Sequence, residues 1–104
     1  MPSYLLTYQG GMPRTAREAR ASLKRWEAWF NRLGRSVAQR GTPVKDSKMV
    51  GSSGLRRGNS RISGYSVLRA VDSFTAARLA KTCPIYREGG RLSISEVIRL
   101  PRRG

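Results

Sequence analysis

The side chains available for acid–base chemistry are few in this sequence. No histidine occurs, so proton transfer at neutral pH would fall to carboxylates, tyrosine or lysine. Of the carboxylates, Glu18 and Asp72 are explained as helix caps. Glu96 differs, because it shares a predicted strand face with apolar Leu92 and Ile94, where a carboxylate costs free energy unless it is paired. Glu96 is therefore the catalytic candidate. An ion pair with a nearby arginine is the alternative, and whether the chain is an enzyme stays open.

Other side chains have the chemistry to contact a bound molecule. Tyrosine hydroxyls donate and accept hydrogen bonds, and basic residues near the ends of adjacent strands suit an anionic group. The candidate ligand-binding residues are Tyr8, Lys48, Arg61, Tyr65 and Tyr86. Buried tyrosines are also ordinary core residues with one satisfied hydroxyl. Two basic residues carry little weight in so basic a chain, so both interpretations stay open.

The single cysteine, Cys83, excludes an internal disulfide and a cysteine-rich metal site. It lies on the apolar face of a predicted helix, just before the Pro84 that is expected to stop this helix, where a thiol is usually a small core residue. The segment GSSGLRRGNSR, residues 51–61, is a predicted loop whose amides and arginines could hold phosphate. It lacks the Gly-Lys-Ser/Thr of a P-loop. We predict no metal and no cofactor.

The length and the charge of the chain limit the classes of protein to which it can belong. The 104 residues predict a single domain, residues 1–104. Lys and Arg number 21 against 6 Asp and Glu, and the field of this +15 charge attracts polyanions. The arginines are spread along the chain, so a solvated basic surface and a nucleic-acid partner are both open. We find no apolar window long enough to span a membrane and no leader peptide, so we expect no membrane contact and a cytoplasmic location.

Apolar patterning predicts four strands. They are expected at residues 3–8, 44–50, 62–70 and 91–100. The last alternates apolar and polar residues as far as Leu100, which is typical of a strand with one buried face. Gly, Thr and Pro at residues 41–43 predict a turn, and loop 51–61 is expected to join the second and third strands as a long hairpin.

Two helices are expected between these strands. The first begins after Thr15, which forms a capping box with Glu18, and ends near Gly34. Its apolar residues fall on one stripe at three- and four-residue steps: Ala19, Leu23, Trp26, Phe30 and Leu33, widened by Trp29. The second helix is expected to be capped by Asp72 or Ser73.

The order β-α-β-β-α-β predicts the α+β class, with a ferredoxin-like antiparallel sheet and both helices on one face. Its strands nevertheless carry apolar residues on both faces, such as Leu5 beside Leu6 and Val67 beside Leu68. The face without helices needs a cover, and the sheet of a second copy is the simplest one. We therefore predict a symmetric homodimer, with further association left open.

Several short segments of the chain are weak signals by themselves, but their order along the chain is specific. They are YLLTYQGG (4–11), WEAWFNRLG (26–34), SKMVG (47–51), GYSVLRAVDSFTAARLAKTCPIYREGG (64–90) and ISEVIRLP (94–101). Together they resemble the YCII-related domain family over nearly the whole chain. The resemblance implies a dimeric α+β barrel, in which two ferredoxin-like units face each other across a cleft between their sheets.

The chain departs from that family where its chemistry is concerned. Some relatives carry a His–Asp pair proposed as catalytic, and another branch of the family carries an Asp-Gly-Pro-Phe motif. Neither occurs in this sequence. The residue after Cys-Pro is Ile85 here, where some relatives have histidine. We expect a YCII-related homodimer that binds an unknown small molecule in the inter-subunit cleft without that pair. The alternatives are an enzyme that uses Glu96 or a cleft tyrosine, and a protein that binds nucleic acid or another polyanion through its charge.

Overall fold

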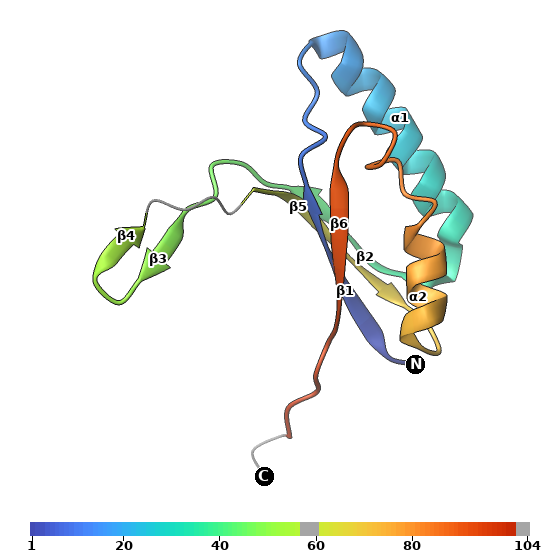
Figure 1. Cartoon of the computed structure of the whole chain (residues 1–104). Helices are drawn as coiled ribbons and strands as arrows, with labels where there is room; N and C mark the ends of the chain where they lie inside the picture. Colours follow the sequence, from blue (N-terminus) through green and yellow to red (C-terminus); the bar gives the residue numbers. More distant parts are fainter. Residues whose placement is uncertain (57–60, 102–104) are drawn as a thin grey trace.

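The computed structural model describes residues 1–56 and 61–101, and its main body is a four-stranded antiparallel sheet with two helices on one face (Figure 1). The strands lie in the order β2-β5-β1-β6. The elements are β1 (Ser3–Gln9), α1 (Ala16–Leu33), the short 3-10 helix η1 (Gly34–Ser36), β2 (Val37–Pro43), β3 (Met49–Gly51), β4 (Gly54–Arg56), β5 (Ile62–Arg69), α2 (Ser73–Ala80) and β6 (Arg91–Glu96). This α+β arrangement is compatible with a ferredoxin-like fold.

The two central strands, β1 and β5, occupy almost the predicted residues; β1 alternates throughout between a buried and a half-buried face, and β5 does so from Ser63 to Leu68. Tyr4, Leu6 and Tyr8 of β1 point to the helices, beside Ser66 and Leu68 of β5. The opposite face carries Leu5, Tyr65 and Val67, which are only half-buried because no helix covers them. The prediction of helices on one face of an antiparallel sheet is confirmed.

Helix α1 begins and ends as its sequence predicts. Thr15 accepts a hydrogen bond from the backbone N–H of Glu18 at 3.0 Å. The Glu18 carboxylate accepts from the N–H of Arg14 at 2.8 Å, one residue earlier than in a regular capping box. Gly34 closes the helix at a positive φ of 55°. The apolar stripe packs onto the sheet through Trp29 and Phe30, which are the buried residues of α1.

The second strand of the sheet is β2, at Val37–Pro43, so the predictions of a strand at residues 44–50 and of a turn at 41–43 are wrong. Gly41 lies at an irregularity in the pairing of β2 with β5, with φ of 72°. A Cβ at this position would lie 1.7 Å from the carbonyl oxygen of Tyr65, so only glycine lets the strands approach. Pro43 is tolerated because β2 is an edge strand.

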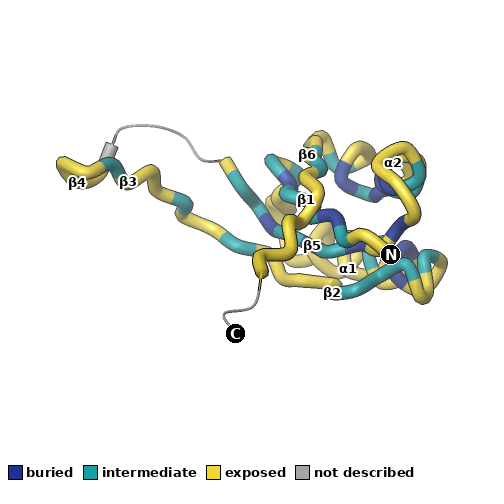
Figure 2. Tube along the Cα trace, turned by 90° about the horizontal axis from the view of Figure 1, so that it is seen from below, coloured by how far each residue is buried: buried dark blue, intermediate teal, exposed yellow. Residues whose placement is uncertain are grey.

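Residues 49–56 form a separate two-stranded hairpin that projects from the main body (Figures 1 and 2). We call β3, β4 and their turn the arm. It occupies the end of the predicted strand 44–50 and part of the predicted loop 51–61, of which residues 57–60 lie outside the described residues. Its Met49, Val50 and Leu55 are exposed, which is unusual for apolar side chains on a strand.

The last strand, β6, ends at Glu96, four residues earlier than predicted. It pairs with β1 alone, and β1 begins at Ser3, whose carbonyl accepts the N–H of Val97 at 2.8 Å. Only Met1 and Pro2 precede β1, and Pro2 has no N–H to offer a longer β6. Ile98 and Leu100, which the alternating pattern placed in the strand, are therefore 79% and 82% exposed.

Helix α2 begins at Ser73 with Asp72 as its cap, and the Asp72 carboxylate accepts the N–H of Thr75 at 2.8 Å. This bond holds the pKa of the Asp72 carboxyl below its ordinary value. The helix ends at Ala80, four residues before Pro84, which has no N–H to bond to the Ala80 carbonyl. Among the described residues, no helix combines the length and the apolar character needed to cross a membrane.

Candidate functional site

A cavity of about 520 Å³ lies between α1 and the helix-facing side of the sheet. Residues of β1, β2, β5 and the loop before α1 complete its walls. The aromatic part of the lining comes from Tyr8, Trp26 and Phe30, and the aliphatic part includes Met12 and Leu23. A volume of this size with mostly apolar walls is typical of sites for small molecules.

The aromatic wall is a packed cluster. Trp26 meets Tyr8 edge to face, with ring centroids 4.8 Å apart, and lies 6.0 Å from Phe30. The guanidinium of Arg40 covers the Phe30 ring at 5.3 Å and donates a hydrogen bond to Asn31. These contacts fix one face of the cavity, so a planar apolar molecule would meet a rigid surface.

The polar groups at the bottom of the cavity are already paired. The Tyr8 hydroxyl donates to Ser66 Oγ at 2.7 Å, and Ser66 Oγ donates to the carbonyl of Arg40 at 2.6 Å. Burial raises the pKa of the Tyr8 hydroxyl well above its ordinary value, so Tyr8 is neutral at physiological pH. Tyr8 therefore presents its ring to the cavity and cannot serve as a base there.

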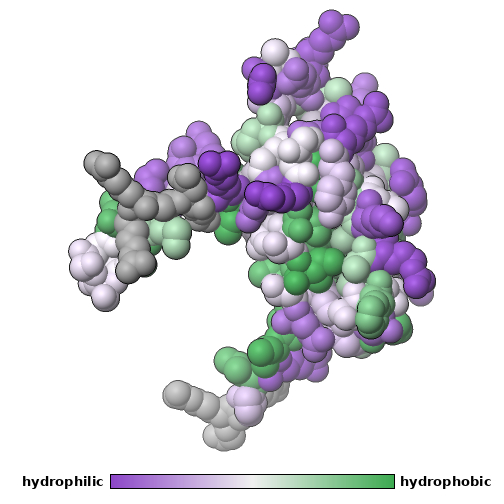
Figure 3. Space-filling view, viewed as in Figure 1, coloured by the Kyte–Doolittle hydropathy of each residue, from purple (hydrophilic) through white to green (hydrophobic). Residues whose placement is uncertain are grey.

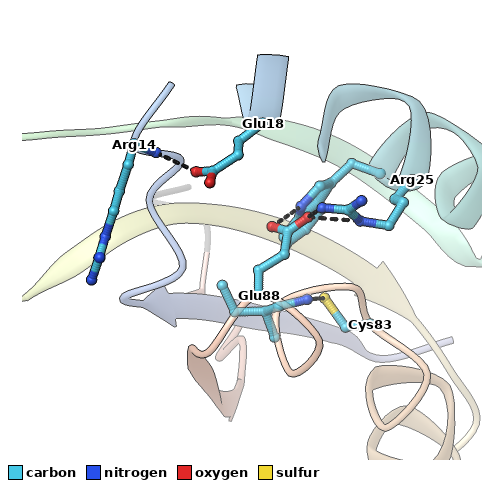
Figure 4. A network of polar contacts seen from close by, with 7 residues as sticks. Arg14, Glu18, Arg25, Cys83 and Glu88 are labelled. Atoms are coloured by element: carbon cyan, nitrogen blue, oxygen red, sulfur yellow. Dashed lines mark hydrogen bonds and ion pairs between the residues drawn. The ribbon is translucent and has the colours of Figure 1, made fainter. Parts of the chain in front are cut away.

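Glu88 ties the loop after α2 to helix α1. Its Oε2 accepts two hydrogen bonds from Arg25, at 2.8 and 3.1 Å, and its Oε1 accepts the indole N–H of Trp26 at 3.0 Å. Figure 4 shows Arg25 and Glu88 facing each other, and Arg14 paired with Glu18 at the start of the helix that carries Arg25. The Glu88 side chain is only 8% exposed. Because both carboxylate oxygens are occupied, Glu88 holds the Trp26 ring in place as a wall of the cavity.

Of the five predicted ligand-binding residues, the structure brings two to the cavity. Tyr8 and Tyr65 are both among its lining residues, but the side chain of Tyr65 lies with Leu5 and Val67 on the opposite face of the sheet. Lys48 is exposed in the segment leading to the arm, and Arg61 is exposed just before β5. Tyr86 is 47% exposed and, like the two basic residues, is absent from the cavity wall.

The catalytic candidate Glu96 lies elsewhere. It is exposed at the end of β6, opposite Tyr4, whereas the cavity lies around Tyr8. Its expected apolar row is shorter than predicted, since Ile98 and Leu100 lie outside the strand. Within the residues that the structure describes, Glu96 has no ion pair with an arginine.

Cys83 is buried, with 4% of its surface exposed, and packs in the core. Burial raises the pKa of its thiol to about 12, so it stays protonated at neutral pH. Residues 1–56 and 61–101 contain no group of three or more Cys, Asp or Glu side chains that could hold a metal ion.

The residues that sequence reasoning missed as site residues are Trp26, Phe30 and Glu88. The helical stripe assigned Trp26 and Phe30 to the core, and Phe30 is indeed 9% exposed. Nothing in the sequence pattern shows that Glu88 returns to α1, because the contact joins residues 62 and 63 positions apart. Neither a comparison with models of protein families nor a search of curated proteins found a match to this chain.

Proposed function

We propose that this protein binds a small, largely apolar molecule in the cavity between α1 and the sheet. The observation that carries the proposal is the rigid aromatic wall of Tyr8, Trp26 and Phe30 around about 520 Å³ of space. The cavity lies on the helix side of the sheet and not in the inter-subunit cleft that the sequence suggested. Of the two carboxylates in its lining, Glu88 is fully paired and Glu27 is exposed to water, so we favour binding over catalysis.

The test uses a helix substitution that fills the cavity. Ala19 lines the cavity and is exposed, so Ala19→Trp should occupy the space without disturbing the core. The neutral dye N-phenyl-1-naphthylamine should bind the unchanged protein saturably, with a rise in fluorescence. We expect Ala19→Trp to weaken this binding by at least about tenfold, which corresponds to about 1.4 kcal/mol.

Ala28→Trp is the matched control, because residue 28 lies nine positions further along the same helix and on its opposite side. It adds the same side chain and should leave the affinity for the dye unchanged. Equal affinity in all three proteins would show that the dye binds elsewhere. Absence of saturable binding to the unchanged protein would remove the proposed function.

We further propose a YCII-related homodimer with a ferredoxin-like fold in each subunit, in which the open faces of two sheets meet. The support is the row of Leu5, Tyr65 and Val67 on the face that no helix covers. Half-buried apolar side chains in adjacent strands make a surface that a second copy with the same row complements. The resemblance described above agrees with this arrangement.

Binding of a polyanion is a second candidate function, and the exposed surface of α1 favours it. Arg17, Arg20 and Lys24 lie at steps of three and four residues on one exposed stripe. Hydrophilic side chains crowd the surface where α1 lies (Figure 3). Among the described residues, none of Arg17, Arg20 and Lys24 is in an ion pair. A row of cationic side chains that are not in ion pairs can contact the phosphates of nucleic acid.

This second function predicts a salt-dependent affinity. Labelled duplex DNA should bind more weakly as salt rises. Replacing the three stripe residues with glutamine should reduce the slope of log affinity against log salt by about one unit for each phosphate that is no longer neutralised. The control replaces Arg69, Arg78 and Arg99, which lie away from α1, and removes the same charge. An identical weakening in both triple variants would show that net charge alone acts, and would refute a binding surface on α1.

A further inference from the structure

A second, polar cavity of about 380 Å³ adjoins the apolar one. Its walls include three arginines, Arg14, Arg25 and Arg87. The two cavities share the residues 11–13, Ser22 and Glu88, so one wall separates a mainly apolar space from a mainly basic one. A single molecule that follows this wall would have an apolar body and a polar end.

The charge at the polar cavity is positive. Its lining has three guanidinium groups and only two carboxylates, those of Glu18 and Glu88. Glu88 is occupied by Arg25 and Trp26, and Glu18 accepts the backbone N–H of Arg14. Among the described residues, the side chains of Arg14 and Arg87 have no carboxylate within ion-pair distance. Both are exposed, so their hydrogen-bond donors are available to a ligand.

We infer that the molecule bound by this protein is an amphipathic anion, whose aromatic or aliphatic body fills the cavity beside Trp26 and whose anionic group lies at Arg14 and Arg87. This inference rests on the proposed function. Guanidinium groups pair with carboxylate, sulfonate and phosphate through two parallel hydrogen bonds. With a neutral ligand, the guanidinium groups of Arg14 and Arg87 would be hydrogen-bonded only to water. A small inorganic anion would make no contact with the apolar wall of the cavity.

Arg25 has a different part in this arrangement. Its Nε and Nη2 atoms both donate to Glu88 and hold this carboxylate in place. The carboxylate in turn accepts the indole N–H of Trp26, so Arg25 affects the cavity only through the orientation of Trp26. Arg25 and Glu88 therefore keep the shared wall rigid, whereas Arg14 and Arg87 are the groups that distinguish charged from neutral ligands. This division identifies the pair whose removal should change ligand selectivity and leave the apolar cavity intact.

The test compares two dyes with the same phenyl-naphthylamine body. One is 8-anilinonaphthalene-1-sulfonate, which is anionic, and the other is the neutral N-phenyl-1-naphthylamine. At physiological salt we expect the anionic dye to bind the unchanged protein about tenfold more tightly. The double variant Arg14→Gln with Arg87→Gln should lose this preference, because its affinity for the anionic dye falls about tenfold while that for the neutral dye stays the same.

The control is Arg69→Gln with Arg78→Gln, which removes the same charge from residues that line neither cavity. It should keep the preference for the anionic dye. An equal fall in affinity for the anionic dye in both double variants would overturn the inference and leave the proposed function standing, because the neutral dye would still bind. Failure of the neutral dye to bind any of these proteins would instead overturn the proposed function itself.

Discussion

Replacing Trp29 with alanine should lower the free energy of unfolding by about 3–5 kcal/mol. Trp29 is 1% exposed, and its indole N–H donates to Thr82 Oγ1 at 2.9 Å. Its ring lies 5.8 Å from that of Trp26 and 5.1 Å from that of Phe30. The substitution removes the largest fully buried side chain of the core and leaves a void that its neighbours can fill only in part.

Urea unfolding followed by circular dichroism measures this change in stability. Leu23→Ala is the control, since Leu23 lies on the same helix but is 59% exposed, and it should cost less than about 1 kcal/mol. Domains of this size are stable by only about 5–15 kcal/mol, so the Trp29 variant is expected to unfold at a much lower urea concentration. Equal destabilisation of the two variants would mean that Trp29 does not anchor α1 to the sheet.

The second large effect is expected at the open face of the sheet, where Val67→Lys should convert the proposed homodimer to a monomer. Val67 lies in β5 beside Leu5 of β1 and Gln39 of β2. In an isolated subunit the lysine would extend into water at little cost. In a symmetric interface it would be buried in both subunits, and the desolvation of two ammonium groups should weaken association by more than about 100-fold.

Sedimentation velocity over a range of concentrations reports the state of each protein. Val71→Lys serves as the control because it adds the same charge at an exposed position outside the sheet, and it should remain dimeric. Salt should favour the dimer, since each subunit carries a charge of +15. A monomeric unchanged protein at every concentration, or a dimeric Val67→Lys variant, contradicts the proposed interface.

The elements that could be predicted from the sequence are those whose signals are local. The alternation in β1 and β5, the cap at Thr15 and the glycine at the end of α1 each depend on neighbouring residues. The second strand is not predictable from its sequence because Gly41 and Pro43 are typical of a turn. The approach of β2 to the carbonyl of Tyr65 explains Gly41, and the edge position of β2 allows Pro43. Ile98 was misplaced because the length of β1 determines where β6 ends.

The candidate site was less predictable than the fold. Tyr8 and Tyr65 were identified for their hydroxyl groups, yet the hydroxyl of Tyr8 is occupied by Ser66 and its ring is what lines the cavity. The helical spacing of Trp26 predicts a core position, because spacing reveals which side of the helix a residue faces but not whether that side is filled. Whether a cavity forms depends on the distance between α1 and the sheet, and this distance cannot be predicted from a local sequence pattern.

The central claim, that the cavity beside Trp26 receives an apolar molecule, is tested most directly by the indole N–H signals in a proton–nitrogen NMR spectrum. The chain has two tryptophans and so two such signals, which Trp26→Phe assigns. On titration with N-phenyl-1-naphthylamine, the Trp26 signal should move to saturation while that of Trp29, which does not line the cavity, stays almost in place. A stationary Trp26 signal at saturating dye would contradict the proposed site.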